Sequence, residues 1–342
     1  MIDLRSDTVT RPTPAMLQAM TSAPLGDDVM GDDPTVNRLQ QAVAERAGKA
    51  AGLFFPSGTQ SNLAGLMAHC ERGDEYLVGQ LAHTYKYEGG GAAVLASIQP
   101  QPIEHAEDGS LPLEKLAAAL KPEGDPHFAR TRLLALENTF HGKLIPADYI
   151  RAATDWARSH GLGTHLDGAR VFNAAVASGK PLADMCESFD SVSICFSKGL
   201  GAPVGSVLVG SAELIARARR WRKMLGGGLR QSGVLAAACL YALEHNVDRL
   251  ADDHDNARQL AEGLRGIAGV RVLSQDTNMV FAQFEPARCE ALTAALAADG
   301  ILMRAVYGGP TRLVTHLDVS AADVRRVVEA VARHLGLSLI HI

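Results

Sequence analysis

A single lysine stands between two apolar runs in the middle of the chain. Residues 191–196 read SVSICF, Lys198 follows after one serine, and a turn rich in glycine and proline leads to the run GSVLVG at 205–210. A lysine at the end of a core strand usually extends to the surface, where its ammonium stays hydrated. Alternatively, Lys198 could supply an amine that bonds covalently to an aldehyde. The remaining polar motifs decide between these interpretations.

Three other stretches carry groups that would complement a reactive amine. Asp167 ends the apolar part of HLDGAR, and His83 follows the apolar run EYLVG. PSGTQSN at 56–62 joins a short strand to a helix, and small or hydroxyl residues there expose backbone N–H groups to an anion. An amine, a buried carboxylate, an aromatic ring and a phosphate site are the groups that pyridoxal 5'-phosphate (PLP) requires. In this hypothesis Lys198 bonds the aldehyde, Asp167 keeps the pyridine nitrogen protonated, and His83 stacks on the ring or moves protons.

Other motif assignments fit less well. GLGAPVG at 199–205 has the spacing GxGxxxG and leads into a strand, so it does not match a dinucleotide-binding turn. SGTQSN lacks the GKS or GKT ending of a P-loop, and no HExxH occurs. DDHDN at 252–256 has metal-ligand residue types, but in a charged helical stretch we expect a solvated face. We therefore expect no metal site.

Charge and composition argue against several protein classes. The chain has 342 residues, enough for one or two domains with a sizeable core. Its formal net charge of −5 argues against a nucleic-acid partner. The most basic stretch, RARRWRKM at 217–224, is expected to be a solvated helix face or a subunit contact. The chain has no run of roughly 18 apolar residues, so no membrane span is predicted.

The cysteines and the first residues predict a cytoplasmic protein. The five cysteines are scattered and never form CxxC, which fits neither a disulfide framework nor a thiolate zinc site. They are Cys70, Cys186, Cys195, Cys239 and Cys289. The start MIDLRSDTVT is charged and does not look like a signal peptide.

The elements that must position these residues alternate between short apolar runs and longer helical stretches. A helix is expected from Pro34, capped by Asp33 and ended by Gly48. The predicted strands include AGLFF, EYLVG, AAVLAS, RLLALEN, GTHLDGA, SVSICFS and GSVLVG, with helices such as ADYIRAATDWARSHG between some of them. This alternation favours a mostly parallel α/β sheet covered on both faces. Because strand ends in such a sheet meet at one crevice, the separate motifs can come together.

The second half of the chain changes pattern twice. From about residue 211 it is helical to about 266, and then short runs such as VRVLS, TNMVFAQF, ILMRAV and TRLVTHL alternate with helices. We interpret this last part as a smaller α+β domain. The apolar ending LSLIHI, residues 337–342, is left out of the fold prediction.

Eight stretches together resemble the low-specificity L-threonine aldolases, which are PLP enzymes of fold type I. They are DLRSDTVTRPT, GDDPTVN, SGTQSN, GQLAHTYKYEGGGAAVLASIQPQPI, HLDGAR, SKGLGAPVGSVLVG, RWRKMLGGGLRQSG and RLVTHLDVS. Each piece is short, but their order and spacing hold from residue 2 to about 336. The resemblance implies an aspartate-aminotransferase-like fold, with a large PLP-binding domain at 1–245 and a small C-terminal domain at 246–342. The N-terminal segment would contribute to the active site.

The resemblance implies a reversible reaction, the cleavage of L-threonine and L-allo-threonine to glycine and acetaldehyde. It also implies a homotetramer whose active sites lie between subunits. Lys198 in SKG would bond the cofactor, Asp167 would pair with the pyridine nitrogen, and His83 would stack on the ring. His83 is the first candidate for the base that accepts the β-hydroxyl proton, and His127 is a second contact for that hydroxyl.

The resemblance also implies residues for the cofactor phosphate and the substrate carboxylate. The phosphate would meet Ser57, Gly58 and Thr59, with Ser197 as a helper and Arg230 reaching the phosphate of a neighbouring subunit. The substrate carboxylate would meet Ser6, Arg170 and Arg312, and Arg170 would also contact the cofactor. A guanidinium fork suits a carboxylate better than an ammonium does, although a surface ion pair remains the alternative for each arginine.

Two stretches depart from the family pattern. Met30 stands in GDDVMGDD where relatives commonly show tyrosine, and ENTFHGK at 137–143 replaces their common ENTHNGK. We expect Phe140 and His141 to alter the wall beside the aldehyde product. The prediction is a catalyst that accepts both threonine diastereomers and aromatic substrates such as phenylserine.

Two alternatives stay open at this point. A β-eliminating lyase, an aminotransferase or a folate-dependent hydroxymethyltransferase would also use Lys198 and Asp167, although the other motifs favour aldol cleavage. A cofactor-binding or scaffold protein without activity would require an inactivated site. The lysine, aspartate, histidine and arginines of the predicted site are all present.

Overall fold

The computed structural model describes residues 1–306 and 308–336, so the apolar ending 337–342 lies outside the described residues. A seven-stranded sheet forms its centre, with the order β2-β8-β7-β6-β5-β3-β4. The strands are β2 (Ala51–Phe55), β3 (Asp74–Gly79), β4 (Gln99–Ile103), β5 (Arg130–Glu137), β6 (Gly163–Gly168), β7 (Ser191–Cys195) and β8 (Ser206–Gly210). β8 pairs antiparallel with β2 and β7, and the other neighbouring strands of this sheet pair in parallel. The prediction of a mostly parallel sheet is confirmed.

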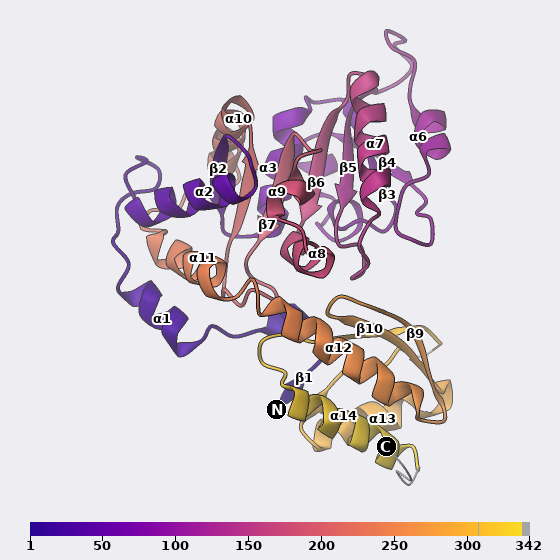
Figure 1. Ribbon diagram of the computed structural model, residues 1–342. Coiled ribbons are helices and arrows are strands. Elements are labelled where there is room, and N and C mark those ends of the chain that lie inside the picture. The colour runs from indigo at the N-terminus through magenta and orange to yellow at the C-terminus, as the bar shows by residue number, and fades with distance from the viewer. Residues whose placement is uncertain (307, 337–342) are drawn as a thin grey trace.

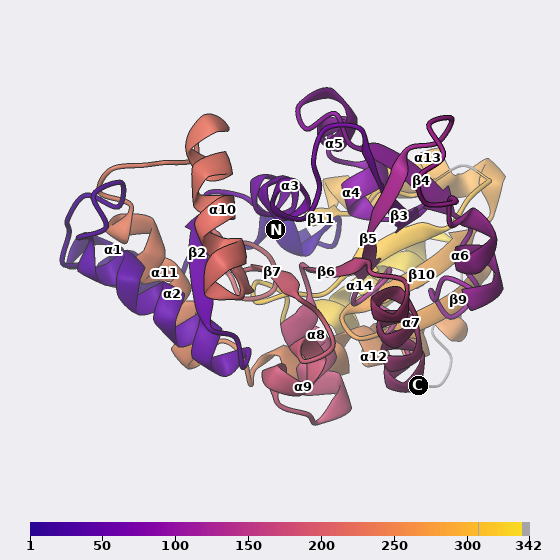
Figure 2. The ribbon, with the colours of Figure 1, turned by 90° about the horizontal axis from the view of Figure 1, so that it is seen from above.

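Helices cover both faces of this sheet because successive strand residues point to opposite sides. In β5, Leu134 and Leu136 pack into one core, whereas Leu133 and Ala135 pack into the other. The first core is covered by α2 (Pro34–Arg46), α7 (Ala147–Ser159), α8 (Val171–Ser178), α9 (Leu182–Cys186) and α11 (Gly233–His245). The opposite face is covered by α3 (Gly58–His69) and α10 (Ala212–Met224). Figure 2 shows α3 and α8 on opposite sides of β6 and β7.

Local signals explain where the helices begin and end. Asp33 accepts hydrogen bonds from the backbone N–H groups of Thr35 and Val36 at the start of α2, and Gly48 adopts a φ of +64° just after its end, as predicted. Ser57 caps α3 in the same way by accepting a bond from the N–H of Gln60. The shorter elements are β1 (Ile2–Asp3), η1 (Asp7–Val9), α1 (Pro14–Thr21), α4 (His83–Lys86), α5 (Gly91–Val94) and α6 (Leu113–Ala119).

One predicted strand is wrong. AAVLAS forms helix α5 and the turn after it, and the strand is the following QPQPI, β4. A short apolar run cannot be assigned to a strand or a helix by its hydrophobicity alone. Pro100 and Pro102 hide the strand in the sequence, yet β4 tolerates them because it lies at the edge of the sheet. Similarly, only Ile301–Leu302 of ILMRAV forms a strand, β11.

The C-terminal residues build a separate core that includes the first residues of the chain. An antiparallel sheet has the order β12-β10-β9, and β1 pairs in parallel with β11. These elements are α12 (Leu250–Arg265), β9 (Val270–Asp276), β10 (Met279–Phe284), η2 (Pro286–Arg288), α13 (Cys289–Ala298), β12 (Thr311–Val314) and α14 (Ala321–His334). Ile2 and Leu4 are buried in this core, and Figure 1 shows the N-terminus beside α14. The division at 245 and 246 stays a prediction.

Two charged stretches are more buried than their composition predicted. Arg222 of RARRWRKM is buried, donates to the carbonyl of Phe54 and lies 2.9 Å from a carboxylate oxygen of Asp28. In DDHDN, Asp253 and Asn256 are buried in α12. The expectation of solvated faces is wrong for these residues, because composition does not show which face of a helix is covered. None of the helices described is long and apolar enough to span a membrane. All five cysteines are free and buried.

Candidate active site

The carboxyl ends of the central strands bring the main predicted residues together. Asp167 lies near the end of β6, opposite Glu137 of β5 on one side and Ser193 of β7 on the other. Lys198 follows directly beyond β7, and its backbone carbonyl accepts a bond from the N–H of Gly201 at 2.8 Å. The convergence of separate motifs at one sheet edge is thus as predicted.

Asp167 is a buried carboxylate with a hydrogen-bond donor on each oxygen. The side-chain amide of Asn62 donates to Oδ2 at 3.0 Å, and the backbone N–H of Ala169 donates to Oδ1 at 3.1 Å. Asn62 is held in turn by His165, whose Nε2 lies 3.2 Å from the amide oxygen. These two hydrogen bonds fix the orientation of the buried carboxylate within the site. Asp167 is therefore built to face a positively charged partner.

His83 lies between two further carboxylates. Its backbone N–H donates to Oε2 of Glu137 at 2.9 Å, and its Nδ1 lies 2.8 Å from Oε1 of Glu88. The hydrogen bond to Glu88 raises the pKa of His83, and the charge of Asp167 adds to this rise, whereas burial opposes it. Burial raises the pKa of Glu137 to about 7, with the charge of Asp167 as the second cause. One side-chain nitrogen of His83 and one carboxylate oxygen each of Glu88 and Asp167 all lie within 4.8 Å of one another.

The start of α3 offers the predicted anion site. The first N–H groups of a helix have no partner within the helix, and they lie here at Gly58 and Thr59, next to the capping Ser57. A Cβ atom built on Gly58 would lie 3.6 Å from Oγ of Ser206. That hydroxyl is buried and has no hydrogen-bond partner among the described residues. Ser206 therefore adds an available polar group beside the helix N-terminus.

Arg170 is held by a carboxylate that the sequence analysis did not single out. Its Nε donates to Oδ2 of Asp7 at 2.7 Å, and its Nη2 donates to Oδ1 at 2.6 Å. Asp7 is fully buried, and the side chain of Asn278 donates to its Oδ2 at 3.3 Å. Ser6, the residue before it, caps η1 by accepting a bond from the N–H of Thr8. The N-terminal segment thus lies next to Arg170.

Arg312 reaches the same region from the C-terminal sheet. It belongs to β12 and is opposite Phe281 of β10. Burial lowers the pKa of Arg312, and the nearby positive charge of Arg170 lowers it further. Nη2 of Arg312 also lies 3.5 Å from the backbone carbonyl of Arg5, next to Ser6. Two guanidinium groups on the same side of a site favour an anion between them. The predicted carboxylate anchors are therefore near each other.

Among the described residues, the side chains of three predicted residues form no hydrogen bond or ion pair with this cluster. The His127 side chain is 84% exposed and lies 2.7 Å from a carboxylate oxygen of Asp125. Arg230 is 59% exposed and pairs with Asp27 at 3.2 Å. Oγ of Ser197 lies 3.4 Å from Sγ of Cys195. The roles of His127, Arg230 and Ser197 stay predictions.

Sequence reasoning missed several polar residues of the site, although each has a signal. Glu137 ends a predicted strand in ALENTF, so its position resembles that of Asp167. Asp7 and Glu88 stand inside the quoted motifs DLRSDTVT and TYKYEGGG. Ser206 has no comparable signal, because a serine at the start of an apolar strand is common.

Comparisons with known proteins agree with this geometry. The family model described as beta-eliminating lyase matches residues 3–287. The chain is 58% identical to the low specificity L-threonine aldolase of Escherichia coli, over 96% of this chain and 97% of that protein. It is 44% identical to the low-specificity L-threonine aldolase 1 of Arabidopsis thaliana, over 94% of this chain and 93% of that protein.

Solved structures of lower identity share the fold. The Leishmania major threonine aldolase superposes with a TM-score of 0.82 at 22% identity, covering 98% of this chain and all (100%) of that one. A structure of SPT with PLP superposes with a TM-score of 0.74 at 17% identity, covering 97% of this chain and 87% of that one. The fold is that of the fold-type I enzymes, and the chain belongs to the low-specificity L-threonine aldolase family.

Proposed function

We propose that this chain is a PLP-dependent carbon–carbon lyase that cleaves L-threonine and L-allo-threonine reversibly to glycine and acetaldehyde. The observation that carries the proposal is the position of Asp167 and His83 at one sheet edge, with Lys198 just after the neighbouring strand β7, in a chain 58% identical to such an enzyme. The substrate would be a small β-hydroxy-α-amino acid.

The residues of the site fit the cofactor. Asp167 can accept a hydrogen bond from the protonated pyridine nitrogen. The start of α3 suits a phosphate group, together with the Ser206 hydroxyl, which has no partner among the described residues. Lys198 supplies the amine that would hold the cofactor covalently. When bound, PLP supplies an acceptor for the electron pair that is released as the Cα–Cβ bond breaks. We assign the phosphate to Ser57, Gly58 and Thr59. Ser197, which precedes Lys198 in the chain, is assigned as a further contact for the phosphate.

The remaining residues orient the substrate and move its protons. Arg170 uses Nε and Nη2 for Asp7, so its Nη1 is available to a substrate carboxylate, together with Arg312 and Ser6. With Glu88 at Nδ1 of His83, Nε2 is the nitrogen that can accept the β-hydroxyl proton. General base catalysis contributes about 10²–10⁴ to a rate. His127 stays the second candidate contact for that hydroxyl.

Product analysis with a lysine variant tests this proposal. Purified protein supplied with PLP should convert L-threonine to equal amounts of glycine and acetaldehyde, and Lys198→Ala should be inactive. Borohydride treatment followed by peptide mapping should find the reduced cofactor on Lys198. Ammonia and a keto acid in place of acetaldehyde would instead indicate a β-eliminating lyase. This activity is the second candidate because the matching family model carries that description.

The proposal extends to assembly and location. We infer a homotetramer with active sites at subunit interfaces, in the cytoplasm. Large apolar side chains are exposed on separate segments, including Met30 (75%), Val94 (76%) and Met224 (65%), and an interface would cover them. Arg230 is exposed in the same way and could reach a neighbouring subunit. Five free cysteines fit a reducing compartment. Light scattering after size-exclusion chromatography should give four times the chain mass.

A further inference from the structure

The loop that follows Lys198 is held through three successive backbone carbonyls. The carbonyl of Lys198 itself accepts a bond from the N–H of Gly201. The carbonyl of Gly199 accepts a longer bond, 3.4 Å, from Nη1 of Arg249. The carbonyl of Leu200 accepts a bond of 2.7 Å from the side-chain amide of Asn246. Two of these three bonds come from side chains far away in the sequence.

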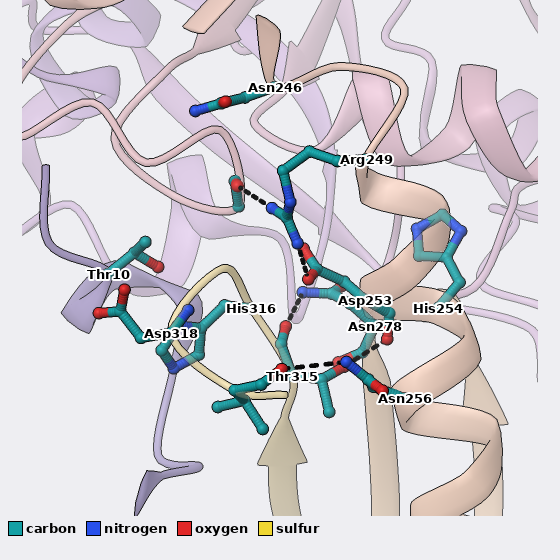
Figure 3. A network of polar contacts seen from close by, with 12 residues as sticks. Thr10, Asn246, Arg249, Asp253, His254, Asn256, Asn278, Thr315, His316 and Asp318 are labelled. Atoms are coloured by element: carbon teal, nitrogen blue, oxygen red, sulfur yellow. Dashed lines mark hydrogen bonds and ion pairs between the residues drawn. The ribbon is translucent and has the colours of Figure 1, made fainter. Parts of the chain in front are cut away.

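Both donors belong to the short segment between α11 and α12. Asn246 is buried, and Arg249 forms an ion pair with Asp253, one helical turn further along α12. Figure 3 shows Arg249 between the loop and Asp253, with Asn246 above them. Because Asp253 is fully buried and charge-assisted bonds are directional, this pair fixes the guanidinium group in its orientation toward the loop.

The loop has little space to move away from this segment. A Cβ atom built on Gly199 would lie 3.0 Å from a methyl carbon of Leu250, a contact tighter than normal packing. Gly201 adopts a φ of +81°, and a Cβ atom there would lie 3.6 Å from the side-chain nitrogen of Asn246. The positive φ of Gly201 favours glycine, and a side chain at Gly199 would require Leu250 to shift. Backbone geometry and side-chain bonds therefore restrain the same four residues.

The contacts continue from this segment to the substrate side of the site. The hydroxyl of Thr315 donates to the backbone carbonyl of Asp253 at 2.6 Å (Figure 3). The amide of Asn278 donates to the carbonyl of Thr315 at 3.1 Å and to Asp7 at 3.3 Å. Asp7 in turn holds Arg170. An unbroken series of polar contacts thus joins the loop after Lys198 to the proposed carboxylate anchor.

We propose that Asn246 and Arg249 are positioning residues for Lys198. They hold the backbone of residues 198–201 so that the lysine amine is presented to the cofactor aldehyde, and they set the rate at which that amine bonds the aldehyde. Neither residue acts on the substrate. The inference rests on the proposed function, because it requires Lys198 to be the lysine that carries PLP.

Covalent capture of PLP by cofactor-free protein tests the inference. The amine nitrogen of Lys198 bonds to the aldehyde carbon, the carbonyl oxygen leaves as water, and hydride from borohydride then fixes the carbon–nitrogen bond. Samples are reduced at successive times, and the modified Lys198 peptide is measured by mass spectrometry. We expect Asn246→Ala and Arg249→Gln to capture PLP at least tenfold more slowly than the wild type. Arg249→Lys should recover part of the rate, since an ammonium can still donate to a carbonyl.

Asn256 provides the matched control on the same helix. Its buried side-chain amide donates to the carbonyl of Val319 at 3.0 Å, so Asn256→Ala removes the same kind of bond without touching the loop. This variant should lose comparable thermal stability and capture PLP at the wild-type rate. Amide hydrogen exchange of residues 199–205, measured without PLP, should accelerate in Asn246→Ala and Arg249→Gln and stay normal in Asn256→Ala.

The outcomes separate the two proposals. If the wild type is modified at Lys198 but the Asn246 and Arg249 variants capture PLP and exchange amides like Asn256→Ala, the positioning role is wrong and the proposed function stands. Modification of the wild type at another lysine would overturn both.

Discussion

Asp7 and Arg170 face each other through two parallel hydrogen bonds, 2.7 and 2.6 Å long, although they are 163 residues apart in the chain. Asp7 is fully buried, and only 12% of the Arg170 side chain is exposed. A two-bond pair fixes the plane of the guanidinium group as well as its position. The N-terminal segment therefore aligns the arginine that we assign to the substrate carboxylate.

Asp7→Asn should destabilise the protein in a pH-dependent way. Burial alone would raise the pKa of Asp7, but Arg170 overcomes this and holds the pKa well below its usual range. The ionised carboxylate thus stabilises the folded state fully at pH values above about 4, and this contribution falls as the pH drops further. At pH 7 the variant should lose about 3 kcal/mol or more of unfolding free energy, because Arg170 is left unpaired.

Urea denaturation of both proteins at pH 7 and pH 3.5 checks this prediction. The difference in unfolding free energy should narrow at the lower pH, where the carboxyl group of the unfolded wild type is largely protonated. Asp3→Asn is a suitable control, because Asp3 pairs with the exposed Arg5. An equal loss of unfolding free energy in Asp7→Asn and Asp3→Asn would show that the buried pair stabilises the fold no more than the exposed pair does.

The sequence predicted which motifs meet at the site better than it predicted which charged residues are buried. Lys198, Asp167 and His83 each stand next to an apolar run, so the rule that parallel strands end at one crevice was sufficient to bring them together. Arg222 was assigned to a solvated face or a subunit contact and Asp253 to a solvated face, because a charged run does not reveal which of its members a neighbouring element covers. Ser206 was missed for a related reason, since its importance depends on Gly58, which is distant in the sequence.

Glu88→Gln should lower the pKa of His83. The hydrogen bond to Glu88 is the main cause that raises this pKa, and a neutral amide cannot replace the charge. If neutral His83 accepts the β-hydroxyl proton, the acid limb of kcat/KM should move to lower pH by roughly one unit. Imidazole NMR signals of the cofactor-free protein report the same shift directly. His83→Ala should abolish the limb, and a Glu88→Gln profile identical to wild type would remove Glu88 from this role.

Glu137→Gln should stabilise the cofactor-free protein as the pH rises. Burial raises the pKa of Glu137 to about 7, so ionisation of this group opposes folding between its unfolded pKa, about 4, and its folded pKa. A glutamine keeps an oxygen that can accept the backbone N–H of His83. The variant and wild type should be similar near pH 5. At pH 8 the variant should be more stable by an amount on the order of 1–3 kcal/mol, measured by urea denaturation. A difference that is constant with pH would mean that Glu137 is ionised throughout.

His141→Asn should reduce the preference for aromatic substrates. The His141 ring stacks on Phe140 with ring centres 4.3 Å apart and approaches Phe281 at 6.0 Å. Phe281 is opposite Arg312 across the strands, so this aromatic group lies beside the proposed carboxylate anchor. Burial and the charge of Arg312 lower the pKa of His141, which keeps the ring neutral at pH 7. Asparagine also tolerates the φ of +50° found at this position, so the loop should keep its shape.

Specificity ratios measure the effect. We expect the wild type to cleave L-threonine, L-allo-threonine and phenylserine. In His141→Asn, kcat/KM for phenylserine should fall up to about tenfold relative to that for threonine, the amount that the loss of one aromatic contact predicts. His105→Asn is the control. His105 stacks on Phe140 with ring centres 4.1 Å apart and packs against Gly79, where a Cβ atom would clash with its ring. This variant therefore removes an aromatic neighbour of Phe140 other than His141. An equal change of the ratio in His105→Asn would assign the effect to Phe140. A wild type that strictly prefers one threonine diastereomer would contradict the prediction that both diastereomers are accepted.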